Sequence, residues 1–482
     1  MDALYVLYND VINSLSNFLY TYILIILLVA GGIYFTVRTR FVQFRYLLES
    51  IRVVMQPSPD QANVSAFQTL MVSTASRVGT GNIAGISTAI CIGGMGAVFW
   101  MWVTALLGSA TAFIEGTLAQ IYKKRAPDGS CYGGPAYYIE QTLKKRWLGV
   151  LFAVVMILTY MVGFNLVASF NIADSFKAFS FYDPSLTPII VGVAVAALFL
   201  LCISGGGKQI AKITSVMVPA MGVLYLIVTV YVVVTHITLV PAVFAGIFRN
   251  AFDVQAIFGG FVGSAVMQGI KRGLFSNEAG IGAAACAAGS AGVSHPAKQG
   301  LVQVLSVFID TILICTCTAM LLLCSGAEFS EELAGMPFVQ AALKSSLGDF
   351  GVIFITIALF LFAFTTLLGN FYYAETGLSY LCRETPSKGL QYLLRGAATV
   401  VVGLGAVMQL STVWNTADVL MGLMAIINIP VLIYLLKPAI LCMKDYSRQK
   451  QAGRDPVFKA SEIGIKAPPD FCQYREPRQR PP

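Results

Sequence analysis

Apolar segments of membrane-spanning length recur along this chain and restrict its fold more than any other feature. A helix needs about 20 apolar residues to cross the hydrocarbon core of a bilayer, and roughly 11 segments here approach or exceed that length. The sequence is 57% hydrophobic and only 12% charged, unlike soluble domains. We therefore predict an all-α polytopic membrane protein. The predicted segments are residues 18–37, 66–92, 97–122, 148–176, 188–203, 213–235, 254–292, 301–324, 350–380, 389–408 and 411–436.

Lys and Arg residues are concentrated in the loops that follow the odd-numbered segments. The loops after even-numbered segments carry only Lys177, Arg249 and Lys344. Lys and Arg residues in short loops remain on the cytoplasmic side of a membrane. We therefore expect the N-terminus outside and the basic tail, residues 437–482, in the cytoplasm. The net charge of +8 follows largely from this bias and requires no nucleic-acid partner.

Two of the predicted segments contain glycine-rich interruptions. Residues 77–85 interrupt the second segment through Gly79, Gly81 and Gly85, and residues 276–282 interrupt the seventh. Glycine inside a helix costs about 1 kcal/mol relative to alanine. Unwound backbone persists at membrane depth only where it is buried in protein or lines a cavity. The interruptions predict a binding site, with close helix packing through small residues as the alternative for a single Gly-x-Gly.

The interrupted segments open two sets of five segments with opposite topology. This pattern is typical of secondary transporters with inverted repeats, whose site lies near the midplane between discontinuous helices. We therefore divide the chain into four parts. These are an N-terminal helix with an amphipathic linker (1–65), a first repeat (66–240), a second repeat (241–436) and a tail (437–482).

The interruptions offer chemistry for two kinds of ligand. Free N–H groups and positive helix ends suit a carboxylate, whereas carbonyl and hydroxyl oxygens suit a small cation such as sodium. Thr365 and Thr366 lie in the middle of the ninth segment and could complete a sodium shell with carbonyls near Val78 and Gly79. The alternative is that both hydroxyls bond to the preceding helical turn. With two interrupted helices present, we favour the sodium site.

Two acidic residues stand out within apolar segments. Asp310 lies in the eighth segment, and a buried intramembrane acid is a functional hypothesis by default. Glu115 lies about two helical turns before Lys123. We expect Glu115 to approach the cytoplasmic interface or to form an ion pair there.

Five motifs occur in this order: Gly79-Thr80-Gly81-Asn82-Ile83-Ala84-Gly85, Gly96-Ala97-Val98-Phe99-Trp100-Met101-Trp102-Val103, Gly133-Gly134-Pro135-Ala136-Tyr137-Tyr138, Phe275-Ser276-Asn277-Glu278-Ala279-Gly280-Ile281-Gly282 and Phe308-Ile309-Asp310-Thr311. Together they resemble those of the alanine or glycine:cation symporter family. The resemblance covers residues 38–437 and implies the leucine-transporter fold with an extra N-terminal helix. It also implies sodium-driven uptake of a small neutral amino acid across a bacterial plasma (inner) membrane, and no enzyme activity.

The resemblance also implies which residues bind each ligand. Two positions depart from the family pattern: Ala168 stands where characterised members have Gln, and Asn370 stands where some have Trp. Both positions line the implied pocket, so a larger amino acid becomes possible, although Phe170 could refill the space. The implied amino-acid contacts are Thr80, Gly81, Asn82, Ile281 and Thr366, with Ala168 and Asn370 in the pocket wall, and the implied sodium contacts are Val78, Gly79, Thr365 and Thr366.

Other functional classes compete with a symporter. A membrane-embedded enzyme is disfavoured because the chain has only two histidines, His236 and His295, and lacks a nucleophile elbow or a His-x-x-x-His metal pair. A symporter of a different small zwitterion remains an alternative. So does a channel or binding protein without coupled transport, because interrupted helices alone do not exclude it. Concentrative uptake driven by a sodium gradient distinguishes these readings.

Overall fold

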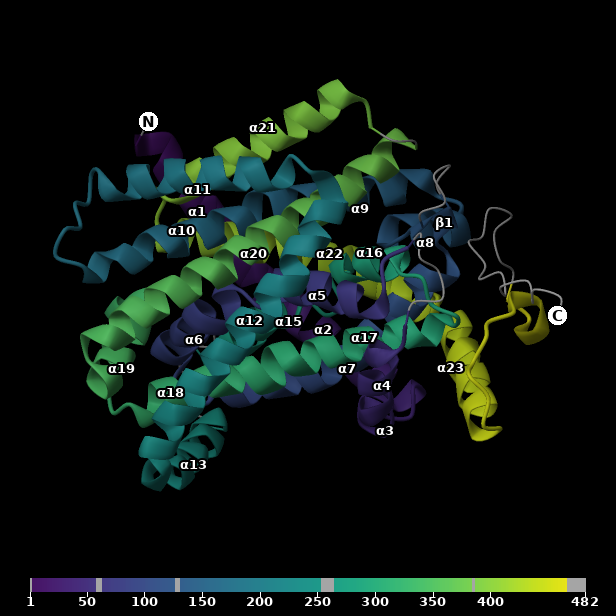
Figure 1. The fold of residues 1–482 in the computed structure, drawn as a ribbon, viewed down its shortest axis with the longest axis horizontal. Helices are drawn as coiled ribbons and strands as arrows, with labels where there is room; N and C mark the ends of the chain where they lie inside the picture. Colours follow the sequence, from purple (N-terminus) through teal and green to yellow (C-terminus); the bar gives the residue numbers. More distant parts are fainter. Residues whose placement is uncertain (1, 58–62, 126–130, 253–263, 384–385, 466–482) are drawn as a thin grey trace.

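The computed structural model describes residues 2–57, 63–125, 131–252, 264–383 and 386–465. Nearly all of them are helical, and long helices such as α11, α17 and α20 run along the longest axis (Figure 1). Within these ranges, seven helices are long and apolar enough to cross a membrane, which identifies a multi-pass membrane protein. They are Tyr5–Arg38, Ala97–Ile121, Arg146–Ala178, Gln209–Thr235, Pro296–Cys324, Asp349–Cys382 and Leu410–Tyr434.

The first half of the chain contains one feature beyond the all-α prediction. A short antiparallel pair joins β1 (Lys124–Arg125) to β2 (Cys131–Tyr132). The helical elements are α1 (Asp2–Phe18), η1 (Leu19–Leu24), α2 (Ile25–Arg38), α3 (Val42–Arg45), α4 (Leu47–Met55), α5 (Ala66–Arg77), η2 (Gly81–Gly85), α6 (Ile86–Gly93), α7 (Ala97–Ile121), α8 (Pro135–Leu143), α9 (Arg146–Ile157), η3 (Leu158–Phe164), α10 (Asn165–Asp174), η4 (Ser175–Ala178), α11 (Thr187–Ile203), α12 (Gly206–Thr235), η5 (Ile237–Leu239) and α13 (Val240–Ala251).

The second half begins with the other interrupted helix. The start of the predicted seventh segment, including Gly259, Gly260 and Gly263, lies outside the described residues. The described elements are α15 (Ala265–Asn277), α16 (Ala283–Ser290), α17 (Pro296–Val307), η7 (Phe308–Cys315), α18 (Thr316–Cys324), η8 (Glu331–Leu333), α19 (Met336–Leu347), α20 (Asp349–Cys382), α21 (Lys388–Gly405), α22 (Leu410–Tyr434), α23 (Leu436–Gln451) and η9 (Ala460–Ile463).

The first membrane helix begins earlier than predicted. We placed its start at Phe18, whereas α1 begins at Asp2 and continues through η1 into α2. The reason is that polar side chains of α1 bond to α22: the Tyr5 hydroxyl lies 2.9 Å from Thr412 Oγ1, and the Tyr8 hydroxyl lies 2.7 Å from Thr416 Oγ1. A search for apolar residues alone does not recognise such a helix.

Helices α7 and α20 flank the two interrupted helices. Helix α7 packs against α15, α16 and α17, and α20 packs against α5, α10 and α12. The start of α5 and the end of α16 are also joined. Val64 and Ala291 form a parallel bridge there, and the Gly292 amide donates to the Val64 carbonyl at 3.0 Å. The fold therefore brings both interrupted helices together in its interior.

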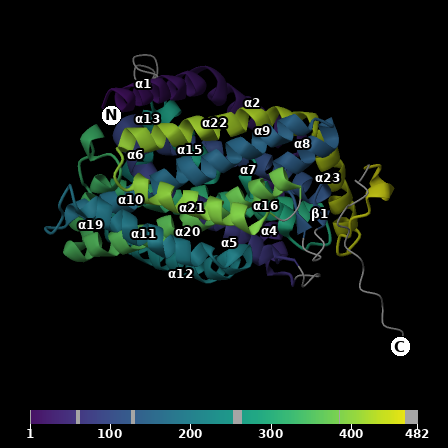
Figure 2. The ribbon, with the colours of Figure 1, turned by 90° about the horizontal axis from the view of Figure 1, so that it is seen from above.

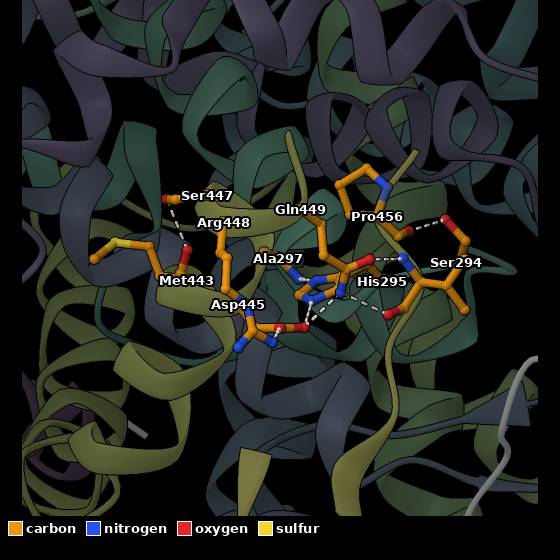
Figure 3. A network of polar contacts seen from close by, with 10 residues as sticks. Ser294, His295, Ala297, Met443, Asp445, Ser447, Arg448, Gln449 and Pro456 are labelled. Atoms are coloured by element: carbon orange, nitrogen blue, oxygen red, sulfur yellow. Dashed lines mark hydrogen bonds and ion pairs between the residues drawn. The ribbon is translucent and has the colours of Figure 1, made fainter. Parts of the chain in front are cut away.

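The chain beyond α22 turns back against the start of α17. Helix α23 lies at the same end of the molecule as β1 and α8, opposite α19 (Figure 1 and Figure 2). His295 caps α17, since its Nδ1 accepts a bond from the Ala297 amide at 3.1 Å and its Nε2 donates to Asp445 at 3.3 Å (Figure 3). We call the following residues the α17–α23 network: Ser294, His295, Lys298, Asp445, Arg448, Gln449, Asp455 and Pro456.

Burial and hydrogen bonding set the charges in the α17–α23 network. Burial lowers the pKa of His295, which favours the neutral ring. The hydrogen bond from His295 is the main reason that the pKa of Asp445 is also lowered. Arg448 and Gln449 donate to the same carboxylate at 2.6 and 2.7 Å. Asp445 is therefore held as an anion with a full set of donors.

Candidate functional site

The first interruption separates α5 from α6. Helix α5 ends at Arg77, and Val78 takes an extended conformation with φ −75° and ψ 90°. The Asn82 side chain stabilises the opening, because its Oδ1 accepts a bond from the Gly79 amide at 2.9 Å. A Cβ atom on Gly79 would lie 2.0 Å from Thr366 Oγ1, so this position requires glycine. The predicted interruption is confirmed, and it presses directly against α20.

The second interruption lies between α15 and α16. Glu278, Gly280 and Gly282 all have positive φ, at +52°, +98° and +88°, so the helix cannot continue through residues 278–282. The Asn428 side chain of α22 donates to the Gly280 carbonyl at 3.0 Å and satisfies part of this exposed backbone. The predicted interruption of the seventh segment is therefore also confirmed.

Asp310 connects the two interrupted helices. Its carboxylate accepts bonds from Asn82 Nδ2 at 2.7 Å, Ser276 Oγ at 2.7 Å and Thr311 Oγ1 at 2.6 Å. Asn82 belongs to the first interruption, and Ser276 lies in the last turn of α15, just before the second. Asp310 lies on η7, the π-helical stretch that continues α17. This acid, singled out in the sequence, is thus the point where both interruptions and a third helix meet.

Thr366 links α20 to α5. Its hydroxyl lies 3.2 Å from the Ala75 carbonyl and 3.0 Å from the Phe362 carbonyl. Thr365 bonds to the same Phe362 carbonyl at 2.9 Å and lies 3.7 Å from the Met221 sulfur. Both threonines thus make the bonds to the preceding turn that the alternative predicted. Only Thr366 also reaches the helix that precedes Val78 and Gly79.

Asn370 belongs to a chain of polar contacts beside the interruptions. Asn370 Nδ2 donates to Asn165 Oδ1 at 3.0 Å, and Asn370 Oδ1 accepts a bond from Ser76 Oγ at 3.3 Å. Ser76 Oγ also lies 2.9 Å from Glu278 Oε1. The chain of contacts therefore runs from α10 through α20 and α5 to the second interruption. Among the two atypical positions, Asn370 is the one placed next to the predicted site.

The remaining predicted residues differ in their surroundings. Thr80 is buried, and its hydroxyl has no hydrogen-bond partner within the described ranges. Gly81 closely approaches Phe275, because a Cβ atom there would lie 2.9 Å from the Phe275 ring. Ile281 is fully buried within the second interruption. Ala168 lies in an apolar cluster with Phe364 and Leu367 of α20.

Glu115 does not lie at the interface where we expected it. It is fully buried in α7, and its Oε1 accepts a bond from Asn428 Nδ2 at 2.6 Å. Lys123 instead donates to the Ala291 carbonyl at 3.0 Å. The prediction of an interfacial role was wrong because it considered only neighbours along one helix. Through Asn428, Glu115 supports the backbone of the second interruption.

A buried ion pair near the first interruption was not predicted from the sequence. Arg272 donates to Asp418 at 2.6 Å and stacks over the Trp414 ring at 4.2 Å. Trp414 in turn contacts Phe275, with ring centroids 4.7 Å apart. The sequence held a signal, since Arg272 and Asp418 are opposite charges within two different apolar segments. Intramembrane charges of opposite sign are expected to pair.

The geometry of this polar centre defines a class of membrane protein. Two discontinuous helices meet at a polar centre inside a multi-pass helical membrane protein. Thr80, Asn82, Asp310, Thr365, Thr366 and Asn370 are all buried, so the centre is sealed from solvent. Unwound backbone with polar side chains at membrane depth is the arrangement that secondary transporters use to hold solutes and ions.

The chain belongs to the sodium:alanine symporter family, whose sequence profile matches residues 5–460. It is 43% identical over 452 residues to the probable sodium/glutamine symporter GlnT of Bacillus subtilis, covering 93% of each chain. It is 40% identical over 433 residues to the sodium/proton-dependent alanine carrier protein of Bacillus sp. PS3, covering 86% of this chain and 95% of the relative. The sodium/alanine symporter AgcS of Methanococcus maripaludis is 36% identical over 430 residues, covering 87% of this chain and 93% of the relative.

Proposed function

We propose that this protein is a sodium-coupled symporter that takes up a small neutral amino acid by alternating access. Family membership and the names of its relatives, which include alanine and glutamine carriers, support this function. The observation that carries the proposal is the sealed polar centre at which two discontinuous helices meet α20. The substrate is alanine- or glycine-like, or a somewhat larger neutral amino acid. The membership of a transporter family supports transport over enzymatic chemistry.

The amino-acid carboxylate binds at the first interruption in this proposal. Thr80 and Gly81 lie at the start of the helical stretch that continues through η2 into α6, and a helix N-terminus attracts an anion. The unpartnered Thr80 hydroxyl offers a further donor. Phe275 lies against Gly81 and gives the substrate side chain an apolar wall. Ile281, Thr366 and Asn370 complete the pocket. Ala168, which belongs to the same apolar cluster as Phe364, acts on pocket volume through α20.

Sodium binds between α5 and α20 in this proposal. Thr366 Oγ1 already lies within 3.2 Å of the Ala75 and Phe362 carbonyls, so several uncharged oxygens gather where the two helices touch. Hard cations prefer oxygen ligands. The carbonyls of Val78 and Gly79 and the hydroxyl of Thr365 complete the proposed shell. The ion thereby fixes the end of α5 against α20 and orders the backbone to which the carboxylate binds.

This arrangement makes the two ligands depend on each other. Sodium beside a carboxylate offsets charge that would be costly to bury alone. The coupling is a free energy shared by both sites, so the amino acid must strengthen sodium binding by the same factor. Equal amino-acid affinity in sodium and in choline would contradict the proposal.

We extend the proposal to the architecture in the membrane. It comprises about 11 spans in a leucine-transporter-like arrangement of two inverted repeats of five, residues 66–240 and 241–436, after an extra N-terminal helix in residues 1–65. The N-terminus lies outside, and residues 437–482 lie in the cytoplasm beneath the plasma membrane. The basic loops and the opposed interrupted helices support this assignment.

The test measures thermal unfolding of the purified protein against a panel of amino acids, once in sodium and once in choline. A ligand at about 100 times its Kd stabilises the native state by about 2.7 kcal/mol. We expect stabilisation by a small group of neutral amino acids only in sodium. Sodium-gradient uptake into proteoliposomes then distinguishes transport from binding alone, and conversion of the solute to a new product would indicate an enzyme.

A variant localises the sodium site. Thr366→Ala removes the hydroxyl that reaches α5. The variant should bind sodium at least about tenfold more weakly, which corresponds to about 1.4 kcal/mol. Thr399→Ala is the matched control, because Thr399 also bonds to its preceding turn, at 2.8 Å to the Arg395 carbonyl, but lies on α21. An unchanged sodium affinity in Thr366→Ala would place the ion elsewhere.

A further inference from the structure

A pocket lined by basic side chains lies between the end of the first membrane helix and α23. One wall comes from α2, α3 and the residues between them, and the other comes from α23 (Figure 1). The pocket has a volume of about 210 Å³, and among the described residues that line it none is acidic. We call it the basic pocket, after its charged lining residues Arg38, Arg40, Arg45, Lys444 and Arg448.

Polar contacts hold the two walls of the basic pocket against each other. The Tyr46 hydroxyl lies 2.6 Å from Ser447 Oγ, although the two residues are 401 positions apart. Glu49 of α4 accepts a bond from the Tyr446 hydroxyl at 2.9 Å and forms an ion pair with Lys450 at 2.6 Å. The basic side chains are therefore gathered by tertiary packing of α2–α4 against α23.

Most of the basic side chains in the pocket lack an acidic partner. Arg448 pairs with Asp445 at 2.6 Å, and the nearby acid Glu49 is already paired with Lys450. Several unpaired cations around one pocket attract an anion, and an arginine can donate two parallel bonds to a phosphate group. The exposed side chains without a carboxylate oxygen within 4 Å in the described part of the chain are Arg38, Arg40, Arg45 and Lys444.

Arg40 occupies a backbone position that favours glycine. Helix α2 ends in a Schellman motif, in which the Phe41 amide donates to the Thr36 carbonyl at 2.9 Å and the Arg40 amide donates to the Val37 carbonyl at 3.0 Å. Arg40 and Phe41 have left-handed φ values of +54° and +57°. Glycine is the usual residue at the Arg40 position of this motif, because a side chain there is strained. The arginine is therefore kept at a cost in backbone energy, and its side chain lines the pocket.

Exposed apolar side chains lie beside the arginines. Arg38 is the last residue of a helix that is long and apolar enough to cross a membrane. Val37, Phe41 and Phe44 are 57, 52 and 54% exposed, although they are large and apolar. Such side chains at the end of a membrane helix are suited to contact with lipid, and the basic groups beside them to contact with headgroups. The basic pocket therefore lies where the headgroups of a bilayer meet the protein.

We propose that the basic pocket binds the phosphate group of an anionic phospholipid, whose acyl chains lie against the exposed apolar side chains of α2 and α3. The lipid belongs to the cytoplasmic leaflet in the orientation proposed above. Basic pockets on the cytoplasmic side of membrane helices suit such headgroups. The bound phosphate offsets the repulsion among the unpaired cations and joins the first membrane helix to α23.

The experiment measures binding of phosphatidylglycerol to the purified full-length protein in detergent, by native mass spectrometry and by thermal unfolding. The wild type should bind this lipid and unfold at a higher temperature with it. Combining Arg40→Gln with Arg45→Gln removes two unpaired charges and should weaken binding about 30-fold. Combining Lys144→Gln with Lys145→Gln is the matched control and should bind as the wild type. Both lysines are exposed at the same end of the molecule, and Lys144 also has a positive φ, of +55°.

A further variant separates the ligand from the backbone. Arg40→Gly introduces the residue that the left-handed position favours. Without added lipid, we expect this variant to unfold at a higher temperature than the wild type. Phosphatidylglycerol should raise its unfolding temperature by less than that of the wild type. A gain from the lipid as large as in the wild type would contradict the role of Arg40 in the pocket.

Two other ligands identify what the pocket recognises. Phosphatidylcholine carries the phosphate beside a compensating positive charge, and inorganic phosphate carries no acyl chain. Neither should stabilise the wild type at the concentration at which phosphatidylglycerol does. Equal stabilisation by either one would overturn the inference, as would equal binding of phosphatidylglycerol by the wild type and the Arg40→Gln, Arg45→Gln variant. The measurement is independent of transport, so a failure of the proposed symport would leave the lipid site standing.

Discussion

The α17–α23 network and the polar centre are both buried clusters of polar side chains, but they differ in how completely these are paired. In the network, both ring nitrogens of His295 have partners, and Asp445 accepts three side-chain bonds. In the centre, atoms of Arg77, Thr80 and Glu278 have none within the described ranges. Unsatisfied buried polar groups are costly. The α17–α23 network is therefore suited to a fixed structural role, and the polar centre is suited to ligand binding.

The two regions are also connected. Ser294 and His295 of the network follow Ala291, which forms the bridge to Val64 just before α5. The network thus anchors the start of α5 and the end of α16. The opposite ends of these two helices border the interruptions, where we propose that the ligands bind. Changes in the network should mainly affect stability, whereas changes in the centre should mainly affect transport.

The largest effect is expected at Gly79. Gly79→Ala would place a Cβ atom 2.0 Å from Thr366 Oγ1, so the Thr366 side chain or the two helices must shift at the proposed sodium site. We expect sodium-driven uptake to fall at least about 100-fold, which corresponds to about 2.7 kcal/mol. Gly222→Ala is the control, because a Cβ atom at Gly222 meets nothing within 4 Å. Normal uptake by Gly79→Ala would remove the distinction between the two regions.

A smaller effect, and on a different property, is expected at Asp445. Asp445→Ala leaves the buried Nε2–H of His295 without its acceptor. An unsatisfied buried donor costs about 1–3 kcal/mol of stability, measured as the free energy of unfolding in detergent. Uptake per folded molecule should stay near the wild-type rate. Asp349→Ala is the control, since the Asp349 pair with Lys344 is exposed. A loss of uptake without a loss of stability would contradict our comparison.

Part of this arrangement was predictable from the sequence. Gly79 and Gly81 within an apolar segment, and the run from Ser276 to Gly282, act through local backbone energetics, so they located both interruptions. Apolar length likewise placed six of the seven membrane-spanning helices of the described residues close to their observed bounds, the exception being the first. These features depend on neighbours along the chain, which sequence patterns record directly.

The partners of polar side chains were not predictable in the same way. Glu115 bonds to Asn428 and Arg272 bonds to Asp418, residues that are 313 and 146 positions apart. Their meeting depends on the packing of α7, α15 and α22. The polar start of α1 was missed for the same reason, because Tyr5 and Tyr8 find their partners on α22. An apolar pattern identifies what is buried, but not which polar groups face each other.

The smallest effect is the pH dependence of the α17–α23 network. The pKa of His295 is lowered by burial, so its folded-state pKa lies below the ordinary value of about 6.5. The unfolded chain therefore binds the proton more readily than the folded chain. The stability that the neutral His295 ring contributes is present above pH 6.5 and is lost as the pH falls toward the folded pKa. Asp445 also has a lowered pKa, so its contribution changes only below about pH 4.

Thermal unfolding between pH 7.5 and 5 checks this expectation. The wild type should lose stability as the pH falls through 6, and His295→Asn should lose less. His236→Asn is the control, because His236 lies at the end of α12, far along the sequence from the network. Equal pH profiles for the wild type and His295→Asn would show that the buried imidazole does not govern this end of the molecule.

Any movement of α5 within the membrane would make this transporter sensitive to membrane voltage through Arg77. It is a buried charge at the end of α5, attached to the protein in every conformation. Moving one elementary charge through 100 mV changes its energy by about 2.3 kcal/mol. A tilt of α5 that carries Arg77 through a quarter of the electric field would therefore shift the balance between conformations by about 0.6 kcal/mol, or about threefold, per 100 mV. The resting potential of the cell would then bias the empty carrier before any solute arrives.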